Sequence, residues 1–250
     1  MTNKTTFTDY VNDQSFMDDY AEYQRKYAST IRESDRIIIN SVADLCNQKK
    51  KVLSLLDIGC STGNLLLHLK NARLPLTLHG GEMALSVLDQ CRSNPALSTI
   101  EFHEVNALEV GRKSAFDIVI VNAVFYLFSH AEFSRSLASI YESLKAGGSC
   151  IVFDFFHPYE QDLSITEVSK THGEGLTLHM RPFSQVEKTC KQIGFESVNF
   201  RPFEIPIDLP KPAELDDIRS HTVIATSGQR LLFRGALHQP WCHLTLKKGA

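Results

Sequence analysis

Apolar runs and amphipathic stretches alternate along the first part of the chain. Apolar runs typical of buried β-strands lie at 52–57, 76–80, 99–104, 116–121 and 149–155. Stretches with helical spacing lie at 14–47, 63–71, 84–93 and 130–145, and the last closes on the basic and glycine residues Lys145-Ala146-Gly147-Gly148. This alternation predicts an α/β fold in which helices cover both faces of a parallel sheet.

The pattern changes after residue 155. Residues 156–180 show no regular periodicity, and we expect them to be irregular. A helix is predicted at 183–193, ending before Gly194, and strands are predicted at 196–205, 222–233 and 242–247. Successive strands without long helices between them predict an antiparallel end to the sheet.

Composition narrows the class of protein. The 250 residues are 43% hydrophobic and 22% charged, which is ordinary for a globular chain with one sizeable domain. The net charge of −3 argues against a surface that binds nucleic acid. The polar N-terminus and the lack of long apolar runs predict neither a signal peptide nor a membrane segment. Six scattered cysteines without a CxxC pair favour a reduced, cytoplasmic setting.

The turn from Asp57 to Gly63 is the strongest functional signal. It follows a central strand, and open α/β sheets bind ligands at the carboxyl ends of such strands. A phosphate-binding loop would need the pattern GxxxxGK[ST], which is absent. A dinucleotide-binding GxGxxG would need glycine where the chain has Ser61 and Asn64.

The pattern Asp57-x-Gly59-x-Ser61-x-Gly63 resembles the first motif, [DE]xGxGxG, of class I S-adenosylmethionine-dependent methyltransferases, with serine for the middle glycine. Four further motifs follow in order: an acid ending the second strand, a polar residue after the third strand, a strand of FDxVxxxx type, and LKAGG, which resembles LKPGG. They are Glu82, Asn106, Phe116 to Ala123, and Leu144 to Gly148. The resemblance covers residues 50–155.

The resemblance implies a Rossmann-like, doubly wound sheet of seven mostly parallel strands in the order 3-2-1-4-5-7-6, with the last strand antiparallel. It also implies N-terminal helices and a C-terminal insertion on the substrate side. We therefore expect one domain over 1–250, with a helical cap at 1–47, a cofactor-binding core at 50–155, and a substrate lid with closing strands at 156–250. The implied cofactor is S-adenosyl-L-methionine, and the product is S-adenosyl-L-homocysteine.

The same resemblance implies roles for individual residues. Asp57 complements the ammonium group of the cofactor, or else only caps the turn. Glu82 accepts hydrogen bonds from two ribose hydroxyls, or else caps the helix that starts near Ala84. Asn106 stands where the family has an aspartate that meets the adenine amino group. The complete set of implied cofactor-binding residues is Asp57, Gly59, Cys60, Ser61, Gly63, Glu82, Met83, Asn106, Ala107, Asn122 and Tyr20.

The segments that flank the core contain the candidate substrate contacts. Four aromatic residues share one face of the N-terminal helix, which either contacts ligands or packs on the core: Phe16, Tyr20, Tyr23 and Tyr27. We name Tyr23 and Tyr126 as candidate substrate contacts. His157 directly follows the fifth strand and is a candidate general base, or else a structural histidine.

We expect no metal site. The C-terminal segment contains His238, Cys242 and His243. If 241–247 is a strand, Cys242 and His243 point to opposite faces, and together they form no ligand set.

The function predicted is transfer of a methyl group to oxygen or nitrogen of a small-molecule metabolite or sugar. The alternative is a non-catalytic or regulatory protein that binds the same cofactor. Asn122 to Tyr126 lacks the acidic stretch of polyamine-forming enzymes and the NPPY-type motif of nucleic-acid amino-methyltransferases. We therefore expect a small-molecule partner, with neither nucleic acid nor membrane, and leave the oligomeric state open.

Overall fold

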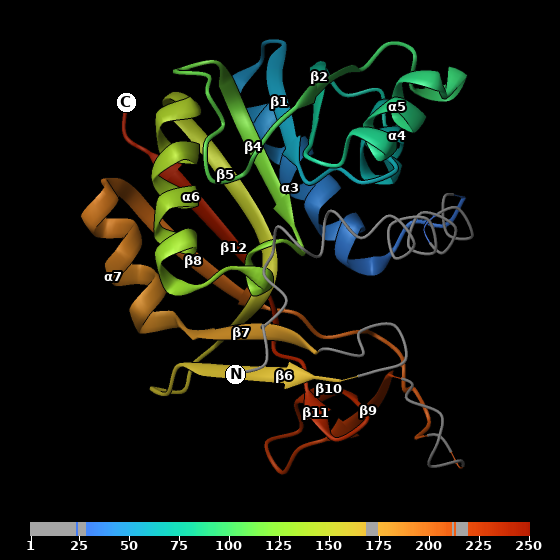
Figure 1. The fold of residues 1–250 in the computed structure, drawn as a ribbon, viewed down its shortest axis with the longest axis vertical. Coiled ribbons are helices and arrows are strands. Elements are labelled where there is room, and N and C mark those ends of the chain that lie inside the picture. Colours follow the sequence, from blue (N-terminus) through green and yellow to red (C-terminus); the bar gives the residue numbers. More distant parts are fainter. Residues whose placement is uncertain (1–23, 25–28, 169–174, 212, 214–219) are drawn as a thin grey trace.

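The computed structural model describes residues 24, 29–168, 175–211, 213 and 220–250. Their elements, drawn in Figure 1, are α3 (Glu33–Lys49), β1 (Leu53–Ile58), α4 (Asn64–Asn71), β2 (Leu76–Glu82), α5 (Leu85–Ser93), η1 (Pro95–Leu97), β3 (Glu101–Glu104), β4 (Phe116–Asn122), η2 (Phe125–Leu127), α6 (His130–Ser143), β5 (Leu144–His157), β6 (Leu163–Glu167), β7 (Leu176–Pro182), α7 (Phe183–Ile193), β8 (Phe195–Pro202), β9 (Ser220–Ile224), β10 (Arg230–Arg234), β11 (Leu237–His238) and β12 (Trp241–Lys248).

The central sheet has the order β3-β2-β1-β4-β5-β12-β8. The first five strands are parallel, and β12 is antiparallel to both of its neighbours. With β8 and β12 taken as the sixth and seventh core strands, the predicted order 3-2-1-4-5-7-6 is confirmed. The sheet therefore gathers the carboxyl ends of β1, β2 and β4 side by side.

Helices cover both faces of this sheet, as the alternating pattern predicts (Figure 1). On one face, apolar residues of α3, α4 and α5 pack against β1 and β4. On the other face, α6 and α7 pack against β4 and β5. Because β1 and β4 are buried on both faces, their sequences are continuous apolar runs.

Several predicted bounds are wrong. The stretch predicted as helical at 14–47 is interrupted at residues 29–32, and α3 begins only at Glu33. Helix α6 ends at Ser143 rather than at 145, because Leu144 already pairs with Phe116 and starts β5. The single strand predicted at 222–233 is a hairpin of β9 and β10. Its turn is closed by the amide of Ala225 donating to the carbonyl of Gln229 at 2.9 Å, and Gly228 takes the positive φ of 84° that this turn requires.

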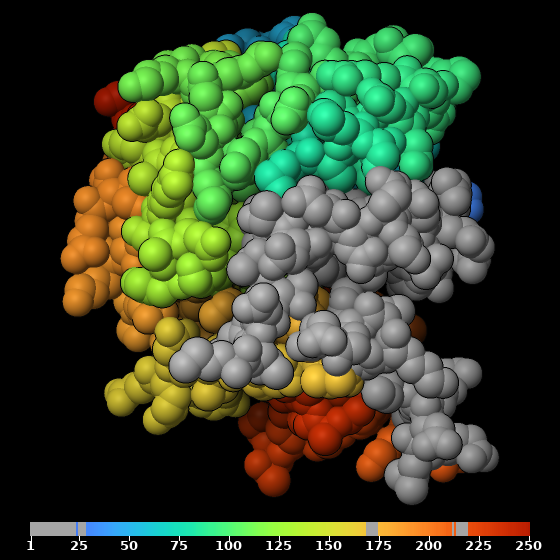
Figure 2. All heavy atoms as spheres, viewed as in Figure 1, coloured from blue at the N-terminus to red at the C-terminus, as the bar shows by residue number. Residues whose placement is uncertain are grey.

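The segment 156–180 is also more regular than predicted. β6 and β7 form an antiparallel pair, and β7 continues the sheet by pairing in parallel with the end of β5. Leu178 and Met180 are buried against Phe155, which is why this strand forms despite its polar neighbours. In Figures 1 and 2, β6 and β7 lie at the same end of the molecule as the three-stranded sheet β11-β10-β9.

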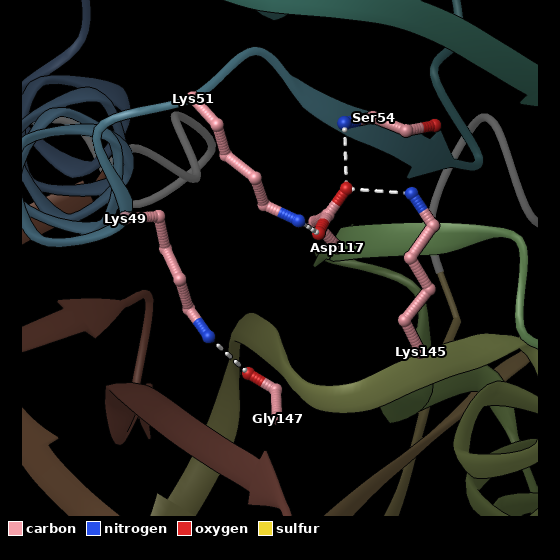
Figure 3. Close-up of polar contacts among 6 residues, drawn as sticks. All are labelled: Lys49, Lys51, Ser54, Asp117, Lys145 and Gly147. Atoms are coloured by element: carbon pink, nitrogen blue, oxygen red, sulfur yellow. Dashed lines mark hydrogen bonds and ion pairs between the residues drawn. The ribbon is translucent and has the colours of Figure 1, made fainter. Parts of the chain in front are cut away.

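Asp117 links the core strands to one another near their amino ends (Figure 3). Its carboxylate accepts from Lys51 at 2.9 Å, from Lys145 at 2.7 Å and from the amide of Ser54 at 3.1 Å. Burial opposes its ionisation, but these donors outweigh burial and lower the pKa of Asp117 to about 2. Asp117 and Lys145 belong to the FDxVxxxx and LKAGG motifs, so these parts of the motifs join β1, β4 and β5 rather than bind a ligand.

In the described part of the chain, no helix is both long enough and apolar enough to cross a lipid bilayer.

Candidate functional site

The backbone conformation of the turn after β1 requires glycine at two positions. Gly59 and Gly63 have φ of 70° and 78°, in the left-handed region. A Cβ at Gly59 would lie 2.7 Å from a methyl carbon of Val124, so only glycine fits. The amides of Gly59 and Cys60 donate to the carbonyl of Gly81 at 2.8 and 3.1 Å, which fixes the turn against the end of β2.

Ser61 stands at the position of the middle glycine of the motif, and its backbone has a conformation that is typical of glycine. Its φ is 48°, in the region that favours glycine, so the turn holds a strained residue at this position. The thiol of Cys91 donates to the carbonyl of Ser61 at 3.0 Å, and the amide of Ser61 donates to Glu82 at 3.1 Å. These bonds from α5 and β2 hold the turn in shape.

Glu82 ends β2 and is 8% exposed. One carboxylate oxygen accepts from the amides of Met83 at 2.8 Å and Ala84 at 3.0 Å, while the other accepts from Ser61. The helix-capping role left open by the sequence is therefore present. Because a carboxylate has about four lone-pair positions, three amide bonds leave room for a further donor.

Asp57, the last acid of β1, lines a cavity at the turn. It is 2% exposed, and its Oδ1 atom has no hydrogen-bond partner in the part of the chain that the structure describes. The cavity is also lined by Thr30, Arg32, Asp35, Gly59, Cys60, Ser61, Thr62, Asn64, Leu65, His68, Asn122 and Ala123. Asp35 comes from α3, and its carboxylate accepts from the side-chain amide of Asn122 at 3.1 Å. A buried acid with an orphaned oxygen is costly unless a ligand compensates it.

The electrostatics of this cavity favour a cation. Burial first, and then the charges of Asp35 and Glu82, raise the pKa of Asp57 well above 3.8. Burial also raises the pKa of Asp35, against the opposing charge of Arg32. A cationic group placed beside the two carboxylates would relieve both effects, and Arg32 also lines this cavity.

Only some of the predicted cofactor-binding residues lie together in the structure. Asp57, Gly59, Cys60, Ser61 and Asn122 line this cavity, and Gly63 closes the turn beside Leu97. Asn106 is exposed, and its side-chain oxygen accepts from the amide of Leu108 at 2.9 Å. Ala107 is buried, and Met83 is half-buried. Tyr20 and Tyr23 lie outside the described residues.

Two buried charged side chains, Asp154 and Arg181, fix the segment that follows β4. The carboxylate of Asp154 accepts from the amides of Val124 at 3.0 Å and Phe125 at 2.7 Å. The guanidinium of Arg181, 1% exposed, donates to the carbonyls of Phe125 and Phe128. Neither charged residue was predicted. Each is a charge inside an apolar strand, and such a charge stays buried only where partners satisfy it.

His157 lines a second cavity, between the end of β5 and the hairpin of β10 and β11. Tyr159, Arg230, His238 and Trp241 are among its other lining residues. The imidazole is 1% exposed, and its Nε2 atom lies 3.1 Å from the carbonyl of Met180. Because a carbonyl only accepts, Nε2 carries a hydrogen, and the buried Nδ1 atom has no hydrogen-bond partner among the described residues.

Tyr126 lies beside this second cavity rather than in the first. Its ring is 5.3 Å from that of Phe155 and 6.1 Å from that of Trp241. His157 and Tyr126 are therefore both near Trp241, while the residues of the glycine turn are grouped at the first cavity.

Residues 55–148 match a family model described as a methyltransferase domain. The chain is 30% identical over 110 residues to a protein of Geobacillus sp. (strain WCH70) named as a methyltransferase. It is 27% identical over 140 residues to a malonyl-[acyl-carrier protein] O-methyltransferase of Acetivibrio thermocellus. These matches cover 43% and 56% of this chain, and only 44% and 45% of the two relatives.

Among solved structures, human N-acetylserotonin methyltransferase in complex with SAM aligns with a TM-score of 0.63 and 14% identity. The alignment covers 98% of this chain and 59% of the human one. At this level of identity the likeness concerns the fold, which agrees with the predicted α/β architecture.

The burial of Asp57 generates a prediction for the free protein. Asp57→Asn removes a buried charge without changing the size of the side chain, so we expect the melting temperature to rise by about 2–8 °C, corresponding to about 1–2 kcal/mol. Calorimetry near neutral pH measures this. The matched control is Asp44→Asn, at an exposed position of α3, which should change the melting temperature by less than about 2 °C. A lower melting temperature for Asp57→Asn would show that its carboxylate stabilises the fold.

Proposed function

We propose that this chain, which belongs to the class I S-adenosylmethionine-dependent methyltransferase family, methylates an oxygen or nitrogen atom of a small-molecule metabolite or sugar. The observation that carries the proposal is the buried carboxylate of Asp57, whose orphaned oxygen faces a cavity walled by the glycine turn. A cationic ligand compensates such a group. The cofactor carries an ammonium group and a sulfonium.

The charged residues of the first cavity fit the amino-acid part of the cofactor. Asp57 and Asp35 hold the ammonium group, and Asn122, already bonded to Asp35, orients that carboxylate. Arg32 supplies a positive charge for the cofactor carboxylate. Gly59 allows the turn to pass close to Val124, so that its backbone lies at the wall of the cavity.

Residues at the ends of β2 and β3 are assigned to the nucleoside. Glu82 retains acceptor capacity for the ribose hydroxyls, and Met83 follows it. Asn106 lies after β3 and remains the proposed contact to the adenine amino group, together with the backbone of Ala107. Cys60 and Gly63 belong to the same turn, and Tyr20 remains a prediction.

The chemistry of transfer places few demands on the chain. When bound, S-adenosyl-L-methionine supplies a methyl group on a positively charged sulfur, which becomes a neutral thioether on transfer. The chain has to hold the acceptor in line and keep water out. Asp154 and Arg181 contribute by fixing the segment from Val124 to Phe128.

We assign the acceptor to the second cavity. His157 provides a base at Nδ1 whose tautomer is set by Met180, and such a base suits an acceptor hydroxyl or amine that loses a proton. Tyr126 and Trp241 supply aromatic surface near it, and Tyr23 remains a predicted substrate contact. The names of two similar proteins, a malonyl-[acyl-carrier protein] O-methyltransferase and N-acetylserotonin methyltransferase, support acceptors other than nucleic acid.

Titration calorimetry tests the cofactor assignment. We expect the protein to bind S-adenosyl-L-methionine and S-adenosyl-L-homocysteine and not NAD. Glu82→Ala should weaken binding by about 1.5–3 kcal/mol, the range for hydrogen bonds to a charged group. Glu104→Ala is the matched control, since Glu104 pairs with Glu82 across β2 and β3 but is exposed, and its affinity should equal that of the wild type.

Two outcomes separate the alternatives. Binding of NAD, or equal affinities for the wild type and Glu82→Ala, contradicts the proposed cofactor. Binding of S-adenosyl-L-methionine without release of S-adenosyl-L-homocysteine, over a broad panel of small hydroxyl and amine acceptors, would support the non-catalytic alternative instead.

The role of His157 is tested separately. His157→Ala should lower turnover by about 10²–10⁴-fold, the range of general base catalysis, while the affinity for S-adenosyl-L-methionine stays unchanged. His238→Ala is the control, because His238 lines the same cavity, and its turnover should stay within a few-fold of the wild type. Equal turnover of His157→Ala and the wild type would mean that positioning alone drives transfer.

A further inference from the structure

Two histidines and a glutamate meet at the edge of the central sheet, away from both cavities. His79 lies on β2, and Glu101 and His103 lie two positions apart on the neighbouring edge strand β3. In the parallel register His79 pairs with Glu101. The ring of His79 packs edge-on against Phe116 at 5.5 Å, on the face of the sheet that α6 and α7 cover further along.

The donor atoms of these three side chains are grouped as a metal ion would group them. The Nδ1 atom of His79 lies 3.3 Å from Nε2 of His103, and one oxygen of Glu101 lies 3.4 Å from the first and 3.7 Å from the second. A point equidistant from the corners of a triangle with these sides is about 2.0 Å from each, since 3.3 × 3.4 × 3.7 divided by four times the area gives this radius. Bonds from zinc to imidazole nitrogen and carboxylate oxygen are about 2.0–2.2 Å long.

We propose that His79, Glu101 and His103 form a binding site for a divalent first-row transition metal of the Zn²⁺ type. Two imidazoles and one carboxylate are a ligand set that such ions use, whereas Mg²⁺ and Ca²⁺ prefer oxygen ligands. The side chain of Glu101 is 64% exposed, so the site is open to solvent and leaves the fourth position to water. No sequence motif of fixed spacing indicates this group, because its members come from two strands.

Arg112 competes with the metal. Its Nη2 atom lies 3.1 Å from Nδ1 of His103, to which it donates, so the hydrogen of the neutral ring is on Nε2. Metal binding requires that hydrogen to move to Nδ1, and therefore requires Arg112 to turn away. Arg112 is exposed and free to do so. Its charge also opposes a nearby cation.

The bound ion would join β2 to β3 next to the proposed nucleoside contacts. Glu82 lies three residues after His79, and Asn106 lies three residues after His103. β3 pairs only with β2 through four residues, so it is the least supported strand of the central sheet among those described. A metal ion bound by one side chain of β2 and two of β3 adds to this pairing and stabilises the edge of the sheet.

Binding of Zn²⁺ alone tests the proposal, measured by competition with a chromophoric chelator on the full chain without an affinity tag. Glu101→Gln and His103→Ala should each weaken Zn²⁺ binding by more than about 100-fold. Arg112→Ala should tighten it by about tenfold, since it removes a nearby positive charge. The control is His130→Ala, an exposed histidine at the start of α6, which should leave Zn²⁺ affinity unchanged.

A second readout does not depend on the chelator. At Zn²⁺ concentrations about 100 times the dissociation constant, the melting temperature of the wild type should rise by about 5–10 °C, and that of Glu101→Gln should not. Co²⁺ should give the intense visible absorption of a four-coordinate site. Equal Zn²⁺ affinity of the wild type, Glu101→Gln and His103→Ala would place the ion elsewhere, for example on cysteines, and absence of Zn²⁺ binding would overturn the proposal outright.

Discussion

The cost of burying the Asp57 carboxylate shapes the functional end of this protein. The strand β1 carries it into the centre of the sheet, where it is 2% exposed and one of its oxygens has no partner among the described residues. The surroundings increase this cost, because Asp35 and Glu82 are also acids. Glycine at position 59 is required by the close approach of Val124, so this position of the turn adds no polar side chain. In the proposed function, the bound cofactor compensates the buried charge of Asp57.

Polar residues at the amino end of the core strands stabilise the fold, whereas those at the carboxyl end form the candidate site. At the amino end, Asp117 has three donors, and its pKa is lowered to about 2. At the carboxyl end, Asp57 is buried and has a raised pKa. The turn beside it is held by hydrogen bonds between Ser61 and two residues outside the turn, Cys91 and Glu82. Such a division is expected where a site is built at the expense of stability.

Most of the core could be predicted from the sequence, because β1, β2 and β4 are apolar runs that end in the motif residues. The parts that could not be predicted depend on contacts between distant segments. Asp35 occupies an ordinary place for an acid in the first turn of a helix, and nothing in its neighbourhood indicates that it lies beside Asp57. The β6–β7 pair forms because Leu178 and Met180 meet Phe155, a contact with no local signal. His79, Glu101 and His103 likewise meet only through strand pairing.

The pH dependence of cofactor binding tests the central claim most directly. Burial and the neighbouring acids raise the pKa of Asp57 well above 3.8 in the free protein, so its carboxyl stays protonated to a higher pH than an ordinary aspartate, and a bound cation lowers that pKa again. Binding of S-adenosyl-L-methionine should therefore release protons, and its affinity should rise as the pH is raised from acidic to neutral. Calorimetry in two buffers of different ionisation enthalpy measures both quantities, and Asp57→Asn should lose most of the effect. An affinity that is constant over this range, without proton release, would contradict the account.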